Sequence, residues 1–281
     1  MEYAIELKDV SKKYKGFALE NVTFSLPKGS IMGFVGENGA GKSTTLKAIM
    51  DLVRLDKGEI KVLGCDSSNI QSIKEDIGVV FDECHFHDNL KVPNISKMLS
   101  KIYKNWNNES FLFYTKKFKL PMDKVIKDFS RGMKMKLSIA VALSHNAKLL
   151  ILDEATSGLD PIVRDEILDI FLDFIQDENH SVLISSHIIS DLEKVADYIT
   201  FIHEGKIKVS DSKDNLIYNY GMVRCKKDDF PKIDEKYIAG VRKNSYGVEV
   251  LINNKKAFER EHRGLLVEST SIEDIILLQS K

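Results

Sequence analysis

The chain has 281 residues, a hydrophobic fraction of 43%, a charged fraction of 30% and a formal net charge of −1. This balance is typical of a soluble globular protein, with enough apolar residues for one large domain and a small appendage. A net charge this close to zero excludes a strong overall field that attracts nucleic acid or acidic lipid. We therefore expect no nucleic-acid partner.

The cysteines and the apolar segments indicate the cellular compartment in which the protein acts. Cys65, Cys84 and Cys225 are few and far apart, and they form neither a disulfide framework nor a paired zinc-ligand pattern. They fit a reducing cytosol. The N-terminus has neither a basic start nor an apolar core, so it does not resemble a signal peptide. No apolar run reaches the ~18–20 residues that are needed to span a bilayer. If the protein acts at a membrane, we therefore expect it to bind at the membrane surface.

Hydropathy patterns predict strands and helices in alternation along most of the chain. In chain order, the expected elements are strand-like alternation from Met1 to about Leu26, a strand at Ile31–Val35, a helix at Lys42–Val53, strands at Glu59–Leu63 and Ile77–Phe81, helical segments at Pro93–Lys127 and Ser130–Ser144, a strand at Leu149–Leu152, a helix at Ile162–Gln176 and a strand at Val182–Ile184. The last two strands are fully apolar, as expected of strands buried on both faces of a parallel sheet. This alternation predicts an α/β core.

After about Asp214 the apolar segments become shorter. Strands are expected at Met222–Cys225, Ile238–Val241 and Val248–Ile252, with a helix from about Ile272. The turn-forming segment Asn244–Gly247 indicates a hairpin. We therefore expect residues 1–213 to form the main domain and residues 215–281 a small C-terminal α+β appendage.

The strongest motif is a glycine-rich loop that fits the pattern of glycine, four residues, then Gly-Lys-Ser/Thr. It consists of Gly36, Glu37, Asn38, Gly39, Ala40, Gly41, Lys42, Ser43 and Thr44. Glycines let backbone N–H groups point at phosphate oxygens, and the following helix adds a positive dipole. We expect Lys42 to reach the β- and γ-phosphates and the Ser43 hydroxyl to ligate Mg²⁺. A chance glycine-rich turn is disfavoured, because the loop lies between a predicted strand and a predicted helix.

A second motif is the apolar strand Leu149–Leu152, which ends in two acids, Asp153 and Glu154. We expect Asp153 to hold Mg²⁺ through water. We expect Glu154 to polarise the attacking water, since an in-line nucleophile must be oriented opposite the leaving phosphate. Alone, the pattern could be a core strand that ends in solvated acids. The phosphate loop in the same chain favours the catalytic interpretation.

Further motifs follow in the order of a known family. Phe129-Ser130-Arg131-Gly132-Met133 resembles the ABC signature motif, Leu-Ser-Gly-Gly-Gln, and Ser157-Gly158-Leu159-Asp160 resembles the D-loop. Ser185-Ser186-His187 resembles the segment that carries the switch histidine. Tyr14 matches the aromatic residue that stacks on adenine. The chain thus resembles the ATP-binding subunits of ABC transporters over about Glu2–Lys213. The resemblance implies a P-loop NTPase core of the ABC ATPase type, with a helical arm at about residues 84–144.

The resemblance also implies ATP and Mg²⁺ as cofactors. In this family the signature residues contact ATP held by a second copy, which assigns Ser130, Arg131, Gly132 and Met133 to the partner's nucleotide. We therefore expect a head-to-tail homodimer, or a dimer with a closely related ATPase subunit. Transmembrane permease subunits encoded separately would hold it at the cytoplasmic face of the cell membrane.

The switch histidine has two interpretations. By resemblance, His187 would hydrogen-bond the γ-phosphate and help to orient Glu154. A satisfied histidine at the end of a strand is the plainer alternative. Its position directly after an apolar strand favours the switch role. By the same resemblance, Asp160 belongs to the D-loop.

Four positions depart from the family pattern, among them Ala155, which follows Glu154 where proline is common. Asp82 stands where a glutamine usually ends the strand, and an aspartate could ligate Mg²⁺ more strongly than an amide. Arg131 stands where glycine is usual, and Met133 where glutamine is usual. Variants of this kind resemble the bacterial branch that exports drugs and antimicrobial or cytolytic peptides, including exporters of phenol-soluble modulins.

We therefore expect an ATP-hydrolysing subunit that energises a separate permease. One alternative is a soluble ABC ATPase of translation or DNA repair, but those types carry two cassettes or a long coiled-coil insertion, and this sequence has neither. Another is a regulatory module that binds ATP without cleaving it, against which Glu154 and His187 argue. Trp106 either packs beneath the helical arm or helps to form the permease docking surface.

Overall fold

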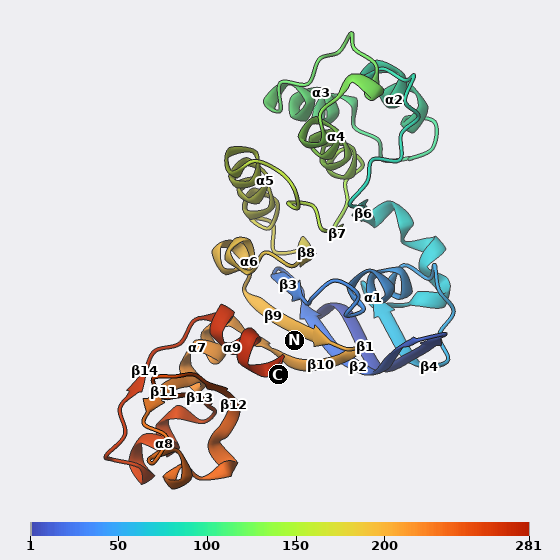
Figure 1. The fold of residues 1–281 in the computed structure, drawn as a ribbon. Helices are drawn as coiled ribbons and strands as arrows, with labels where there is room; N and C mark the ends of the chain where they lie inside the picture. Colours follow the sequence, from blue (N-terminus) through green and yellow to red (C-terminus); the bar gives the residue numbers. More distant parts are fainter. Residues whose placement is uncertain (1, 281) are drawn as a thin grey trace.

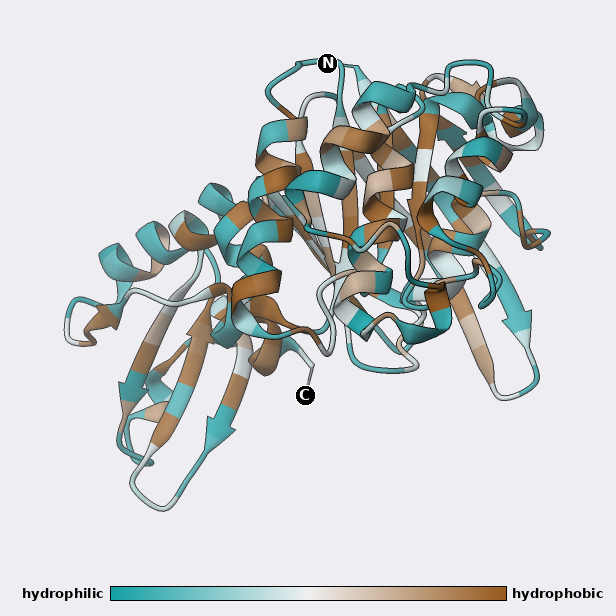
Figure 2. Ribbon diagram, turned by 90° about the horizontal axis from the view of Figure 1, so that it is seen from above, coloured by the Kyte–Doolittle hydropathy of each residue, from teal (hydrophilic) through white to brown (hydrophobic). Residues whose placement is uncertain are grey.

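The computed structural model describes residues 2–280 and has a six-stranded sheet at its centre, in the order β10-β9-β3-β8-β7-β6. Its strands are β3 (Ile31–Val35), β6 (Ile77–Val80), β7 (Leu149–Asp153), β8 (Ser181–Ser186), β9 (Tyr198–His203) and β10 (Lys206–Ser212). The strands are parallel except for β10, which pairs antiparallel with β9. Figure 2 shows these strands as a largely hydrophobic layer between helices. The predicted α/β core is confirmed.

A second sheet packs beside the first, in the order β2-β1-β4-β5. Its strands are β1 (Tyr3–Tyr14), β2 (Phe17–Pro27), β4 (Lys57–Val62) and β5 (Cys65–Asp66). Met1, where the predicted strand-like segment begins, lies outside the described residues. Phe24 of β2 stacks on Phe34 of β3 with ring centroids 5.4 Å apart, which joins the two sheets around α1 (Lys42–Ile49). Helix α1 ends earlier than predicted, because the chain turns at Asp51, whose φ is 54°.

The helical arm consists of α2 (Val92–Leu99), α3 (Asn108–Lys117) and α4 (Arg131–Leu143). Figure 1 shows it at the top of the molecule. The segment predicted as helical at Pro93–Lys127 is two helices with a break between them. Trp106 lies in this break, donates from Nε1 to Ser96 Oγ at 3.3 Å and packs on Phe111 with ring centroids 5.2 Å apart. It therefore packs inside the arm, as the first of its two interpretations holds.

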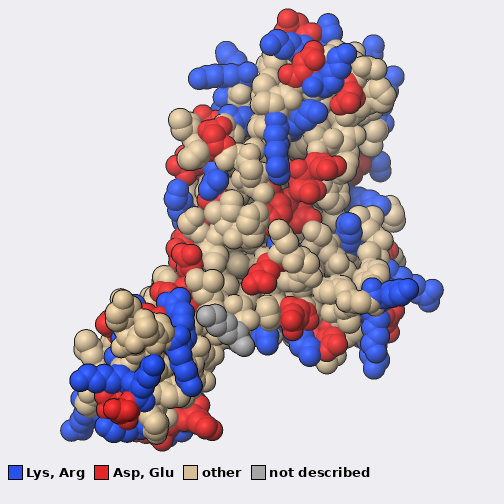
Figure 3. All heavy atoms as spheres, viewed as in Figure 1, with Lys and Arg blue, Asp and Glu red and all other residues tan. Residues whose placement is uncertain are grey.

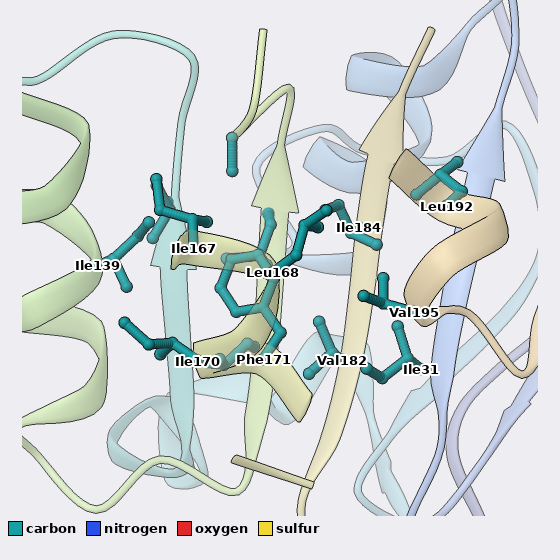
Figure 4. Close-up of a cluster of buried hydrophobic side chains, with 14 of the residues drawn as sticks. Ile31, Ile139, Ile167, Leu168, Ile170, Phe171, Val182, Ile184, Leu192 and Val195 are labelled. Atoms are coloured by element: carbon teal, nitrogen blue, oxygen red, sulfur yellow. The ribbon is translucent and has the colours of Figure 1, made fainter. Parts of the chain in front are cut away.

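Helices α5 (Pro161–Phe174) and α6 (Ile189–Val195) cover the same face of the central sheet as α4. Figure 4 shows Phe171 of α5 between Ile139 of α4 and Val182 of β8. All three side chains are buried, and full burial of one such side chain stabilises the fold by about 1.5–3 kcal/mol. The packing fixes α5 between the arm and the sheet.

The C-terminal part contains a four-stranded sheet in the order β12-β13-β11-β14. Its elements are α7 (Lys213–Asn219), β11 (Gly221–Cys225), β12 (Ile238–Lys243), β13 (Val248–Ile252), α8 (Lys255–Glu261), β14 (Val267–Glu268) and α9 (Ile272–Gln279). Short 3₁₀ helices lie at Ser67–Ser72, Lys74–Asp76, Ile126–Asp128, Phe230–Lys232 and Glu235–Tyr237.

The appendage is joined to the main core by buried apolar contacts. Side chains of α9, Ile275 among them, belong to the same hydrophobic cluster as Leu192 of α6. In addition, the backbone N–H of Ile272 donates to Glu193 Oε1 at 3.1 Å. The appendage is thus anchored on α6, the helix that follows His187.

His145 connects the arm to the core. Its ring is 1% exposed and stacks on Tyr103, with centroids 4.2 Å apart, and its Nδ1 lies 2.9 Å from the carbonyl oxygen of Glu75. Burial lowers the pKa of His145, although the hydrogen bond to Glu75 opposes this. The folded state therefore favours the neutral ring, and the unfolded chain takes up a proton below its ordinary pKa of about 6.5.

We predict that acid weakens the fold partly through this residue. As pH falls through about 6.5 towards the lowered folded pKa, the unfolded state binds more protons, so the free energy of unfolding decreases. His145→Phe keeps a ring for Tyr103 but does not titrate. Denaturant unfolding at several pH values between about 7.5 and 5.5 should show a smaller decrease for the variant than for the unaltered protein. Equal decreases would contradict the assignment.

Candidate active site

The carboxyl ends of three neighbouring parallel strands define the site. Strand β8 lies between β3 and β7, and the register pairs Val35 with Ser186 and Asp153 with Ser185. The loops that follow β3, β7 and β8 therefore start at one edge of the sheet, where ligands of α/β proteins bind. These loops begin with Gly36, Glu154 and His187.

The phosphate loop depends on its glycines. Gly41 precedes α1 with φ 115°, a left-handed conformation that favours glycine. A Cβ there would also lie 2.7 Å from Leu19 and 2.9 Å from Phe17. Gly39, at φ 84°, faces open space. Because the first N–H groups of a helix have no acceptor within the helix, the start of α1 is suited to an anion.

Two predicted residues, Lys42 and His187, contact the carboxylate of a third, Glu154. The Lys42 ammonium is buried and donates to the carbonyl oxygens of Gly36 at 2.7 Å and Glu37 at 3.2 Å. It also lies 3.2 Å from Glu154 Oε1, while Glu154 Oε2 lies 2.7 Å from His187 Nδ1. Lys42, Glu154 and His187 therefore lie in one chain of polar contacts at the sheet edge.

The backbone at Glu154 is strained, with φ 52°, in a region that costs a non-glycine residue of order 1 kcal/mol or more. Two bonds to Ser185 hold it: the N–H of Glu154 donates to the carbonyl oxygen at 3.1 Å and to Oγ at 3.2 Å. In this conformation the carboxylate of Glu154 lies 3.2 Å from the Lys42 ammonium.

Sequence reasoning gave Ser185 no role of its own. Its hydroxyl donates to Asp153 Oδ1 at 2.6 Å, in a place where both residues are buried. Ser185 thus fixes Asp153 and Glu154 together. Its signal in the sequence is a polar residue that follows three apolar ones, Val182–Ile184, inside a strand expected to be buried.

The site fits ATP with Mg²⁺. Backbone N–H groups and the Lys42 ammonium form a cradle for an anion, and the buried Glu154 Oε1 faces that ammonium at 3.2 Å. The carboxylate of Asp153 and the exposed hydroxyl of Ser43 supply the oxygen ligands that Mg²⁺ prefers. Within residues 2–280, no group of three or more His, Cys, Asp or Glu side chains could hold a metal ion. The phosphates would have to complete the ligand shell.

The signature and D-loop residues form a second group. Ser130 caps α4, because its Oγ accepts from the Met133 N–H at 3.2 Å, and Asp160 caps α5 by accepting from the Val163 N–H at 3.1 Å. Gly132 lines, together with Ser130 and Asp160, a hollow of about 290 Å³. The structure brings these residues together in a hollow that Lys42 does not line. Such a division suits a site completed by another chain.

The two remaining predicted residues lie at the margins of these groups. Tyr14 ends β1 opposite Phe17, the residue that approaches Gly41, and is 45% exposed. Asp82 follows β6 and is exposed, in a hollow of about 580 Å³ that Arg131 also lines. Its role as a Mg²⁺ ligand stays a prediction.

Among residues 2–280, no helix has the length and apolarity needed to cross a membrane. Figure 3 shows acidic and basic side chains interspersed over the face it presents.

Comparisons with known proteins agree with this geometry. Residues 19–157 match the family model described as ABC transporter. The lantibiotic transport ATP-binding protein SrtF of Streptococcus pyogenes is 38% identical over 218 residues, which cover 75% of this chain and 93% of SrtF. The bacitracin transport ATP-binding protein BcrA of Enterococcus faecalis is 33% identical over 211 residues, which cover 74% of this chain and 68% of BcrA.

Solved structures share the fold. An ATP-binding subunit of an ABC transporter superposes with a TM-score of 0.67 at 25% identity, over 76% of this chain and 92% of that one. The dimeric, post-hydrolysis state of the cassette MJ0796 with bound ADP and phosphate superposes with a TM-score of 0.66 at 22% identity, over 74% and 98% of the two chains. The second likeness, at this identity, shows the fold alone.

Proposed function

The chain belongs to the ATP-binding proteins of ABC transporters and is an ATPase that uses ATP and Mg²⁺, and we propose that it drives the export of antimicrobial peptides or drugs. The assignment of ATP hydrolysis to this site is supported by one observation: Lys42 and His187 both contact the carboxylate of Glu154. The cargo is supported by the relatives, since SrtF is named for lantibiotic transport and BcrA for bacitracin transport.

In the proposed mechanism, Lys42 exchanges its contact with Glu154 for the β- and γ-phosphates of ATP. The released carboxylate of Glu154 then orients a water molecule in line with the γ-phosphate and accepts its proton. His187, 2.7 Å from Glu154, holds that carboxylate and reaches the γ-phosphate. Bound through Ser43 and Asp153, Mg²⁺ would neutralise phosphate charge. We propose that Asp82 adds an oxygen to its shell, and that Tyr14 stacks on adenine.

ATP-binding subunits of ABC transporters work with membrane components. For this chain we propose a head-to-tail homodimer, or a pair with a closely related subunit, in which Ser130 and Gly132 contact the partner's ATP. Separately encoded permease subunits would hold the pair at the cytoplasmic face of the membrane. We propose that residues 1–213 form the ATPase domain, with the arm at about 84–144, and residues 215–281 an accessory domain.

The first test addresses the proposed base. Glu154→Gln should still bind Mg-ATP, because the phosphate loop is unchanged, but its turnover should decrease by about 10²–10⁴-fold. Size-exclusion chromatography with Mg-ATP should show a trapped dimer. Glu178→Gln, an exposed acid far along the chain, serves as the matched control and should retain full turnover. Near-normal hydrolysis by Glu154→Gln would remove this residue from the mechanism.

A second test addresses the shared site. Lys42→Ala loses its own phosphate contacts, and Ser130→Arg blocks the site of its partner, so each homodimer should be almost inactive. In a heterodimer of the two, one site carries both changes and the other carries neither. If the subunits mix at random and the sites act independently, an equimolar mixture should regain about a quarter of the unaltered turnover. Full activity of a demonstrably monomeric preparation would refute the model.

A further inference from the structure

The D-loop and the catalytic acid form one continuous segment. The N–H of Ser157 donates to the carbonyl oxygen of Glu154 at 3.0 Å, which closes the turn that leads into Gly158 and Leu159. Glu154 is itself held in a strained conformation. A displacement of the D-loop would therefore move the backbone that aims the Glu154 carboxylate.

Arg131 of the signature motif packs directly against this turn. Gly158 has φ 68°, and a Cβ at this position would lie 2.5 Å from Nη1 of Arg131 and 2.9 Å from its Cζ. The guanidinium thus occupies the space that the missing side chain of Gly158 leaves open. A glycine at position 131, the usual residue of the family that the motif resembles, has no side chain with which to make this contact.

The opposite side of the D-loop is held by a second arginine. Arg164 of α5 donates from Nη2 to the carbonyl oxygen of Leu159 at 3.3 Å and lies 3.4 Å from Asp191 of α6. Asp191 is buried, and α6 begins two residues after His187. Helix α5 is fixed on the sheet by the packing shown in Figure 4. One contact of the turn is therefore made by α5, which is tied to α6, and the other by Arg131, the first residue of α4.

We propose that Arg131 is a positioning residue for ATP hydrolysis, which passes the position of α4 to Glu154 through the D-loop of its own chain. Ser130, the residue before it, caps α4 and is the one proposed to meet the partner's ATP. Contact of Ser130 with the partner's nucleotide would then change the position of the Glu154 carboxylate, through the contact between Arg131 and Gly158. This inference rests on the proposed function in assigning hydrolysis to Glu154 and the partner's nucleotide to Ser130.

A double-mutant cycle in the full-length chain tests the contact. The variants are Arg131→Ala, Gly158→Ala and both together. Because the arginine side chain is flexible, the added methyl group should push it aside rather than unfold the turn. We expect each single change to lower kcat by about three- to thirtyfold, and the double variant to lose no more than the worse single one. The cost of alanine at a positive φ is the same in both backgrounds and cancels in the cycle.

Two further measurements separate a positioning role from a purely structural one. The KM for ATP and the thermal unfolding midpoint of Arg131→Ala should match those of the unaltered protein, so that kcat alone changes. Lys127→Ala, which removes an exposed cation shortly before the signature, is the matched control and should leave kcat within about twofold.

Several outcomes would overturn the inference. They are an unchanged kcat in Arg131→Ala, additive effects in the cycle, or an increase in KM without a change in kcat, which would place Arg131 on the partner's nucleotide instead. Glu154→Gln is measured beside the cycle. If it is inactive while the cycle is additive, only the role of Arg131 fails, whereas an active Glu154→Gln refutes the proposed mechanism itself.

Discussion

The parallel pairing of β3, β8 and β7 is the constraint on which the rest of the structure depends. Its register places Val35 beside Ser186 and Asp153 beside Ser185, so three loops that are far apart in sequence begin side by side. A slip of one residue would exchange the two faces of a strand and carry its loop out of the site. The strands are buried on both faces, and the helices α4, α5 and α6 on one side and α1 on the other hold that register by packing.

At this edge of the sheet, the charges of Lys42 and Glu154 stabilise each other. An ammonium as buried as that of Lys42 needs a carboxylate or a ring of acceptors, and it has both in Glu154 and two loop carbonyls. An arriving phosphate can replace the carboxylate at Lys42, because it is also negatively charged and can accept hydrogen bonds from the loop N–H groups. In the proposed mechanism, binding of substrate and release of the Glu154 carboxylate are then the same event.

The sequence predicted those parts of the molecule whose signals are local. The apolar strands and the glycine loop indicated the α/β core, and Ser130 was expected at the start of the helix that the structure shows as α4. Helix α6 and the pair β9–β10 went unpredicted, because seven residues carry too little periodicity and their burial comes from contacts with distant segments. The stack of His145 on Tyr103 and the packing of Arg131 on Gly158 join residues far apart in the chain, which no local pattern reveals.

The central claim is that Glu154 is held by Lys42 until phosphate takes its place. A crystal structure of the protein with Mg²⁺ and a non-hydrolysable ATP analogue tests it most directly. The account predicts that the Lys42 ammonium, now 3.2 Å from Glu154 Oε1, contacts phosphate oxygens, with Glu154 free to hold a water molecule beside His187. A bound nucleotide whose phosphates leave the contact between Lys42 and Glu154 intact would contradict the account.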